Sequence, residues 1–147
     1  MNKQPLLEAK QVSISFPMPN HGSILVVDEI NFILHEGEFV AILGSSGSGK
    51  SSFLRCLSGL IPPSKGSVLY RNKPLTGANP NVSMVFQSAA LFPWLNVMDN
   101  VSVGLKAKGT PKDEIEKRSL SGIDLVGLDG FETAYPKELS GGMRQRV

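Results

Sequence analysis

Residues 44–51 read Gly-Ser-Ser-Gly-Ser-Gly-Lys-Ser, a complete G-x-x-x-x-G-K-[ST] phosphate-binding loop. Its glycines lack side chains, so consecutive backbone amides can surround phosphate oxygens. Lys50 is placed to reach the β- and γ-phosphates of a nucleotide, and Ser51 to bind Mg²⁺. A flexible Gly/Ser loop with an accidental Lys-Ser is the alternative, but the loop joins an apolar segment to an amphipathic one. The predicted nucleotide contacts are Gly44, Ser45, Ser46, Gly47, Ser48, Gly49, Lys50, Ser51 and Ser52.

A second segment with phosphate-binding features begins at Leu139, where Leu-Ser-Gly-Gly leads into Met-Arg-Gln-Arg-Val. Ser140, Gly141 and Gly142 are typical of an ordinary helix N-cap, because serine caps helices and glycine tolerates unusual backbone angles. The same residues also leave a helix start bare, so that a γ-phosphate could approach its amides. The upstream phosphate loop favours the second interpretation. Together the two segments predict the halves of a two-sided ATP site.

Length, charge and cysteine content narrow the class of protein. A chain of 147 residues with 41% hydrophobic residues predicts one domain. The net charge of +2 is dispersed, so nucleic acid is not the favoured partner. A single cysteine, Cys56, excludes an internal disulfide framework and suits a reducing compartment. No signal peptide or membrane anchor is visible in the sequence, so any work at a membrane would need a partner there.

Hydrophobic patterning predicts an α/β chain. Alternation favours antiparallel strands at residues 7–14, 24–27 and 30–34, the last two separated by Asp28-Glu29. The apolar run 38–43 predicts a strand that is buried on both faces and feeds the phosphate loop. Helical spacing follows Lys50 until the Gly-Leu-Ile-Pro-Pro segment. Further strands are expected at 67–70 and 82–86, and further helices at 97–105 and 111–128.

These motifs resemble the nucleotide-binding subunits of ATP-binding cassette (ABC) transporters over essentially the whole chain. Residues 139–146 match the family's signature motif. Gln87, in Val-Phe-Gln, matches the glutamine that reaches the Mg²⁺ and attacking-water region and relays nucleotide state to membrane subunits. Phe16 falls where the family places an aromatic that stacks on adenine, although an ordinary strand or loop aromatic is the alternative. The resemblance implies catalytic roles for Lys50 and Gln87, and Mg²⁺ binding by Ser51 and Gln87.

The segment 87–101 resembles the importer branch, especially nitrate, sulfonate and taurine uptake systems. In such importers this region receives a short coupling helix from the membrane subunit. Phe92 and Trp94 lie in an apolar cluster interrupted by proline, which suits a docking surface. The alternative is that both aromatics complete the core of a helical subdomain.

The family pattern continues beyond the signature into an Asp-ended strand, a catalytic Glu and a switch His, and none of these follows Val147. Phosphoryl transfer depends on such groups. We therefore expect a C-terminally truncated form that lacks the strand after the signature helix and that does not hydrolyse ATP by itself.

The resemblance implies a P-loop NTPase core, an N-terminal antiparallel β layer and a helical subdomain, all within a partial ABC ATP-binding domain at residues 1–147. We expect the β layer and core at 1–87 and the helical subdomain at 88–147. The intact subunit would use ATP and Mg²⁺ to power solute import, paired with a second copy that its signature residues face in trans. It would dock on a permease at the cytoplasmic face of the inner membrane, served indirectly by an extracytoplasmic solute-binding protein. A truncated nucleotide-binding protein without hydrolysis and, less favoured, a DNA-repair ATPase are the alternatives.

Overall fold

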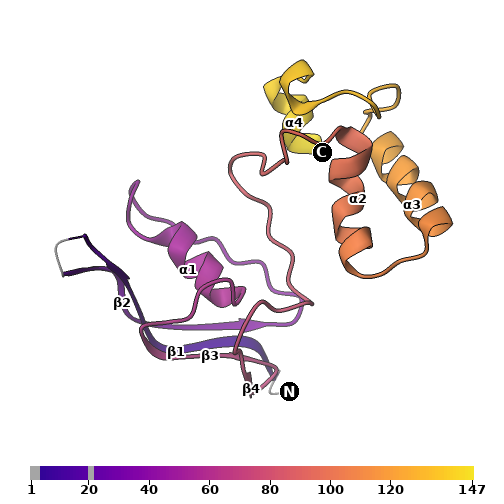
Figure 1. Cartoon of the computed structure of the whole chain (residues 1–147). Coiled ribbons are helices and arrows are strands. Elements are labelled where there is room, and N and C mark those ends of the chain that lie inside the picture. Colours follow the sequence, from indigo (N-terminus) through magenta and orange to yellow (C-terminus); the bar gives the residue numbers. More distant parts are fainter. Residues whose placement is uncertain (1–3, 20–21) are drawn as a thin grey trace. The chain divides into compact units, whose positions relative to one another are not determined.

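The computed structural model describes residues 4–19 and 22–147, which form two compact units, one ending at Met84 and the other beginning at Val85 (Figure 1). The first unit contains a four-stranded antiparallel sheet in the order β2-β1-β3-β4. Its strands are β1 (Pro5–Pro17), β2 (Ser23–His35), β3 (Lys65–Tyr70) and β4 (Lys73–Pro74). The expected N-terminal antiparallel layer is confirmed.

The sequence predicted a break at Asp28-Glu29, but β2 runs through these residues. The β1–β2 register instead shifts on either side of Val12, and Glu29 has a positive φ of 47°. Ser13 Oγ accepts a hydrogen bond from Glu29 N at 3.0 Å and donates one to Asp28 Oδ1 at 3.2 Å. A side chain thus replaces part of the ladder, and the irregularity is a bulge within one strand.

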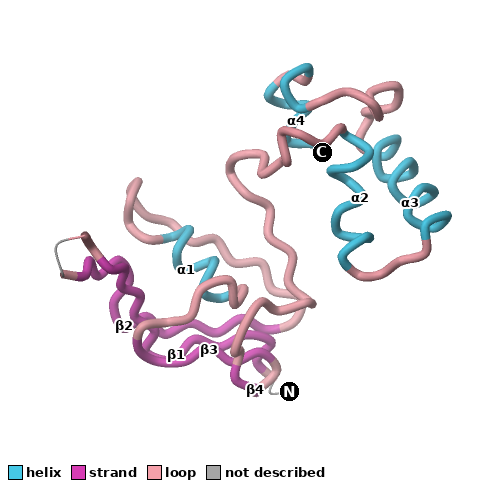
Figure 2. Tube along the Cα trace, viewed as in Figure 1, coloured by secondary structure: helices cyan, strands magenta, loops and turns pink. Residues whose placement is uncertain are grey.

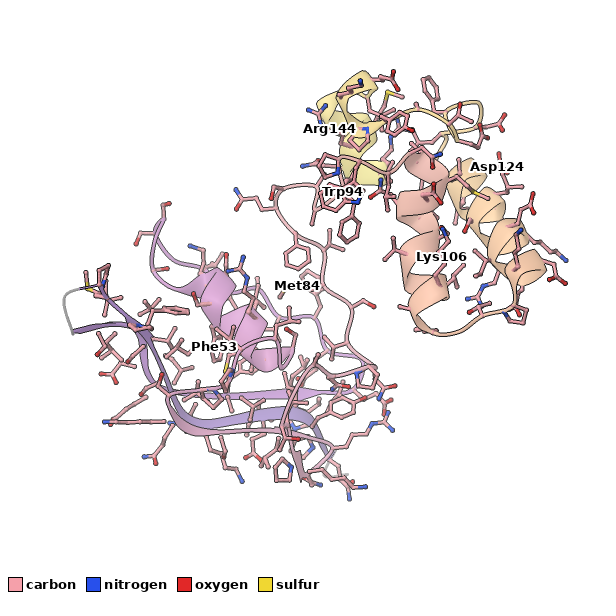
Figure 3. All side chains as sticks on the ribbon, in the orientation of Figure 1. Phe53, Met84, Trp94, Lys106, Asp124 and Arg144 are labelled. Carbon is pink, nitrogen blue, oxygen red and sulfur yellow. The ribbon has the colours of Figure 1, made fainter. Side chains whose placement is uncertain are left out.

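Helix α1 (Lys50–Leu57) packs on the sheet, as Figure 3 shows for Phe53. Phe53, Cys56 and Leu57 all face inward, which is the helical spacing expected from the sequence. They share a core with strand residues that include Val12 and Ile14, and the Phe53 ring meets Phe32 edge-on at 5.9 Å. This packing fixes the start of α1 relative to β1 and β2.

The strands predicted at 38–43 and 82–86 are wrong for this structure, which has both segments as irregular chain (Figure 2). Phe39, Leu43 and Val85 are all at least 90% exposed. A strand buried on both faces needs a neighbouring strand on each side. The sheet of the described residues includes neither segment, so the apolar pattern has nothing to pack against there.

The second unit is helical. It contains α2 (Val97–Ala107), α3 (Lys112–Leu125), the short 3-10 helix η1 (Pro136–Glu138) and α4 (Gly141–Arg146). Its core is formed by Val97, Ile123, Leu128 and Leu139. Helix α3 ends three residues before the predicted Leu128, because Gly127 has a left-handed φ of 64° that stops the helix.

Candidate nucleotide-binding site

The phosphate loop closes on its own lysine. Lys50 Nζ donates hydrogen bonds to Gly44 O at 2.8 Å and Ser45 O at 2.6 Å. Within the loop, Ser48 N donates to Ser45 O at 3.3 Å. The ammonium group therefore lies against the first residues of the loop, where it would interact with an anion bound by the loop amides.

Gly49 shows why the end of the loop requires glycine. Its φ of 88° is left-handed, and a Cβ added there would lie 2.7 Å from Val26 O and 2.9 Å from Val27 Cγ2. The loop thus presses directly on β2. Neither valine was predicted as part of the site, because only the folded chain brings residues 26 and 27 behind residue 49. The neighbouring Gly47 also has a positive φ, but a Cβ added there would meet no atom beyond its chain neighbours within 4 Å.

Helix α1 begins at the loop with unsatisfied backbone donors. Gly49 is its N-cap, no side chain caps it, and its first turn contains no acidic residue. The free amides and the positive end of the helix dipole therefore favour an anion there. Ser51 is exposed in this first turn and Ser52 is half-buried. The start of α1 thus adds donors and a hydroxyl to the same end of the loop as Lys50.

The predicted adenine-stacking residue, Phe16, lies on β1 opposite Ile24 of β2. Two residues back along β1, Ile14 is opposite Val27, one of the two residues that contact the position of Gly49. Strands advance about 3.3 Å per residue, so the ring is attached about 7 Å along the strand from this contact. It is 38% exposed, so part of its surface is open to solvent.

Gln87 and the signature residues belong to the second unit. Gln87 is exposed, and its backbone carbonyl accepts a hydrogen bond from Gln145 Nε2 at 3.3 Å. Gln145 lies on the signature helix α4, 58 residues further along the chain. The sequence did not single out Gln145, because the contact depends on the loop and the helix being brought together by folding.

The signature turn is built as a helix cap. Ser140 is the N-cap of α4, and its Oγ accepts from Met143 N at 3.2 Å. Gly141 and Gly142 follow, both exposed. Arg144 Nη1 donates to the carbonyls of Leu139 and Pro136, so it braces the chain that enters the turn (Figure 3). The described geometry is thus compatible with both interpretations of the motif, since a capped helix start also presents bare amides.

Phe92 and Trp94 remain outside the core of the second unit. Trp94 is 69% exposed and Phe92 39%, and their ring centroids lie 5.5 Å apart with the planes tilted by 52°. Neither contributes to the cluster around Val97 and Leu139. The residues that the structure describes therefore leave an aromatic pair on the surface.

The loop geometry and the oxygen-bearing side chains of the described residues suit a nucleotide and Mg²⁺. A Cβ on Gly44 would lie 2.6 Å from Ser48 Oγ, so the start of the loop curls back close to Ser48, as a backbone cradle for phosphate does. Ser51 supplies a hydroxyl oxygen and Gln87 an amide oxygen, and Mg²⁺ binds oxygen ligands while keeping some of its water.

A family model described as ABC transporter matches residues 27–147. The chain is 44% identical to an uncharacterized ABC transporter ATP-binding protein of Methanocaldococcus jannaschii, with 87% of this chain and 48% of that protein covered. It is also 44% identical to the nitrate import ATP-binding protein NrtD of Synechocystis, with 86% and 47% covered.

Among solved structures, the dimeric post-hydrolysis state of the ATP-binding cassette MJ0796 bound to ADP and phosphate matches with a TM-score of 0.82. The two sequences are 31% identical, and the match covers 95% of this chain and 66% of that one. The chain thus spans about half the length of the curated relatives it matches. No helix among residues 4–19 and 22–147 is long and apolar enough to cross a membrane.

Proposed function

The chain belongs to the ABC transporter family, and on that premise we propose that the full-length protein binds and hydrolyses ATP to drive import of a solute through a separate permease. One observation carries this proposal: the Lys50 ammonium closes the phosphate loop at the uncapped N-terminus of α1. Cation, loop amides and helix dipole all favour phosphate at the same place.

Each predicted residue has a distinct task in this proposal. The loop amides hold the phosphates, Lys50 balances the charge on the β- and γ-phosphates, and Phe16 stacks on adenine. Ser51 and Gln87 would hold Mg²⁺, which offsets phosphate charge when bound. Ser140, Gly141 and Gly142 of a second copy would face the γ-phosphate. Water attacks the phosphorus directly, and no covalent enzyme intermediate forms.

Import and permease docking rest on the relatives and on one surface. The NrtD relative is a nitrate import ATP-binding protein, and a related cassette is a dimer in its solved structure. We assign permease docking to Phe92 and Trp94, because the pair is exposed and outside the core. The protein would then work as a dimer, peripherally, on the cytoplasmic face of the inner membrane, and a solute-binding protein would act on the permease from the other side.

The test is phosphate release from Mg-ATP by the full-length protein, alone and with its permease in lipid vesicles. We expect hydrolysis that rises when the permease and the transported solute are both present. Tight ATP binding without phosphate release would instead support a non-hydrolysing nucleotide-binding protein. Stimulation by DNA and not by the permease would support the DNA-repair class. Residues 1–147 alone should bind nucleotide and release no phosphate above background.

A further inference from the structure

Asn100, in the first turns of α2, holds the chain that carries the exposed aromatic pair. Phe92 N donates to Asn100 Oδ1 at 2.8 Å. Asn100 Nδ2 lies within 3.2 Å of Phe92 O and within 2.9 Å of both Leu95 O and Asn96 O. A side-chain amide offers two N–H groups and one carbonyl oxygen. Its donors and its acceptor are therefore all used on residues 92–96, which we call the aromatic loop.

Capping of α2 does not require Asn100. The N-cap is Asn96, whose Oδ1 accepts from Asp99 N at 2.7 Å. The first turn also contains the acidic Asp99, whose negative charge interacts favourably with the positive end of the helix dipole. The Asn100 amide instead contacts backbone on both sides of Trp94. Its bonds thus fix the shape of the aromatic loop, which is additionally closed by Leu95 N donating to Phe92 O at 3.1 Å.

Holding this loop matters because its aromatics have little else to fix them. Phe92 and Trp94 contact each other, but both are exposed and neither belongs to the helical core. An exposed loop of this kind must lose conformational freedom when a partner binds it. Ordering the loop beforehand removes that cost from the binding step.

We propose that Asn100 is a positioning residue that preorganises the aromatic loop to receive an apolar helical segment of the permease. This inference rests on the proposed function, because it assumes that Phe92 and Trp94 are the docking anchors. Asn100 contributes through the loop backbone, whereas the two aromatic side chains would contribute the buried contact area.

The inference is tested with Asn100→Leu, which keeps the size of the side chain and removes every hydrogen bond, and with Asn100→Asp. The aspartate keeps the acceptor for Phe92 N but faces the three carbonyl oxygens without a donor. Lys106→Ala is the matched control, because Lys106 lies on the same helix and its side chain pairs with Asp99 at 2.8 Å and not with the backbone of the aromatic loop. The variants are made in the full-length protein, with any tryptophan outside residues 1–147 replaced by phenylalanine.

Trp94 is the single tryptophan of this sequence, so its fluorescence reports on the loop directly. We expect both Asn100 variants to lower the Trp94 anisotropy, and Asn100→Leu also to expose the Phe92 amide to hydrogen exchange, while Lys106→Ala leaves both unchanged. Affinity for the permease in lipid nanodiscs should fall by about tenfold or more, since several hydrogen bonds to the loop are lost. Nucleotide affinity should stay the same.

Two outcomes would overturn the inference: an aromatic loop that stays ordered in both Asn100 variants, or a loosened loop that still docks with the original affinity. If Asn100→Leu loses the helical circular dichroism signal, that variant is misfolded, and the anisotropy and docking affinity of Asn100→Asp then test the inference. The double substitution Phe92→Ser and Trp94→Ser separates this inference from the function on which it rests. Normal docking of the double variant refutes the docking assignment itself, whereas lost docking there with normal docking of the Asn100 variants refutes only the role of Asn100.

Discussion

Gln145 Nε2, on the signature helix α4, donates a hydrogen bond to the backbone carbonyl of Gln87 at 3.3 Å. In the proposed function, Gln87 binds Mg²⁺ and the signature turn at Ser140 faces the γ-phosphate of a second copy. The bond joins the start of the segment 87–101, which contains the aromatic loop, to the helix that Ser140 caps. A movement of α4 would therefore shift the backbone at Gln87 or break this hydrogen bond.

We predict that Gln145→Glu slows permease-stimulated hydrolysis by about two- to tenfold, the value of one exposed hydrogen bond. The substitution keeps the length of the side chain and replaces its only donor with an acceptor. Binding of ATP should not change, because Gln145 is not among the proposed ligands. The measurement compares phosphate release with and without permease. Equal stimulation of the original and substituted proteins would show that this bond carries no coupling.

Most local elements could be predicted from the sequence, because they depend on local signals. Helix α1 follows from the apolar spacing after Lys50, and the start of α2 from Asn96 with Asp99 three residues later. The bulge at Asp28-Glu29 could not be predicted, because it depends on Ser13 from the other strand. A polar pair within an apolar run looks like a break until the partner strand is known.

The two wrong strands have a different cause. An apolar run such as 38–43 indicates what the segment would be in a sheet with neighbours on both sides, and the described sheet provides none. The site shows the same division between local and distant signals. Lys50 and its loop were predicted from one motif, whereas Val26 and Gln145 are placed by contacts between distant residues.

Lys50→Ala should weaken Mg-ATP binding to the full-length protein by about 100-fold or more. Hydrogen bonds from a charged group are worth about 1.5–3 kcal/mol each, and the ammonium, which donates to two loop carbonyls here, would donate to the β- and γ-phosphates of a bound nucleotide. Lys65→Ala is the control, because Lys65 is an exposed lysine at the start of β3 in the same unit. Isothermal titration calorimetry measures the Mg-ATP affinity of both variants. Undiminished affinity in Lys50→Ala would show that the phosphate loop is not part of the nucleotide site.

Gly49→Ala should destabilise the first unit by about 2–4 kcal/mol, because the new Cβ would both adopt a left-handed φ and meet Val26 O at 2.7 Å. Gly47→Ala is the matched control. It has a similar φ of 80° but no group within 4 Å, so only the backbone cost of about 1 kcal/mol applies. Urea unfolding of both variants measures the difference. Equal destabilisation would mean that contact with β2 does not shape the loop.

Replacing Phe92 and Trp94 together by serine should reduce co-purification with the permease by at least about tenfold, since aromatic anchors dominate such interfaces. The free energy of unfolding should change by less than about 1 kcal/mol, because both side chains are exposed. Leu125→Ser is a control for the loss of an exposed apolar side chain elsewhere in the unit, at 87% exposure. A large loss of stability in the double variant would favour the core role over the docking role.

Cys56 gives a pH-dependent prediction for the first unit. Cys56 lies on the inner face of α1 and is 1% exposed, and this burial raises the pKa of its thiol above the ordinary value of 9.0. The unfolded chain therefore loses this proton at a lower pH than the folded chain does. Stability from Cys56 is complete below the ordinary pKa and declines as the pH rises through the raised pKa, by at most about 1.4 kcal/mol per pH unit.

Cys56→Ala removes this titration and leaves every other group in place. The free energy of unfolding, measured in urea at pH 8, 9 and 10, should therefore fall more steeply for the original protein than for Cys56→Ala. The alanine variant should be less stable at pH 8 because it leaves a small cavity, so the two curves should converge as the pH rises. Parallel curves across this range would show that the thiol titrates alike in both states, and that α1 does not seal it from water.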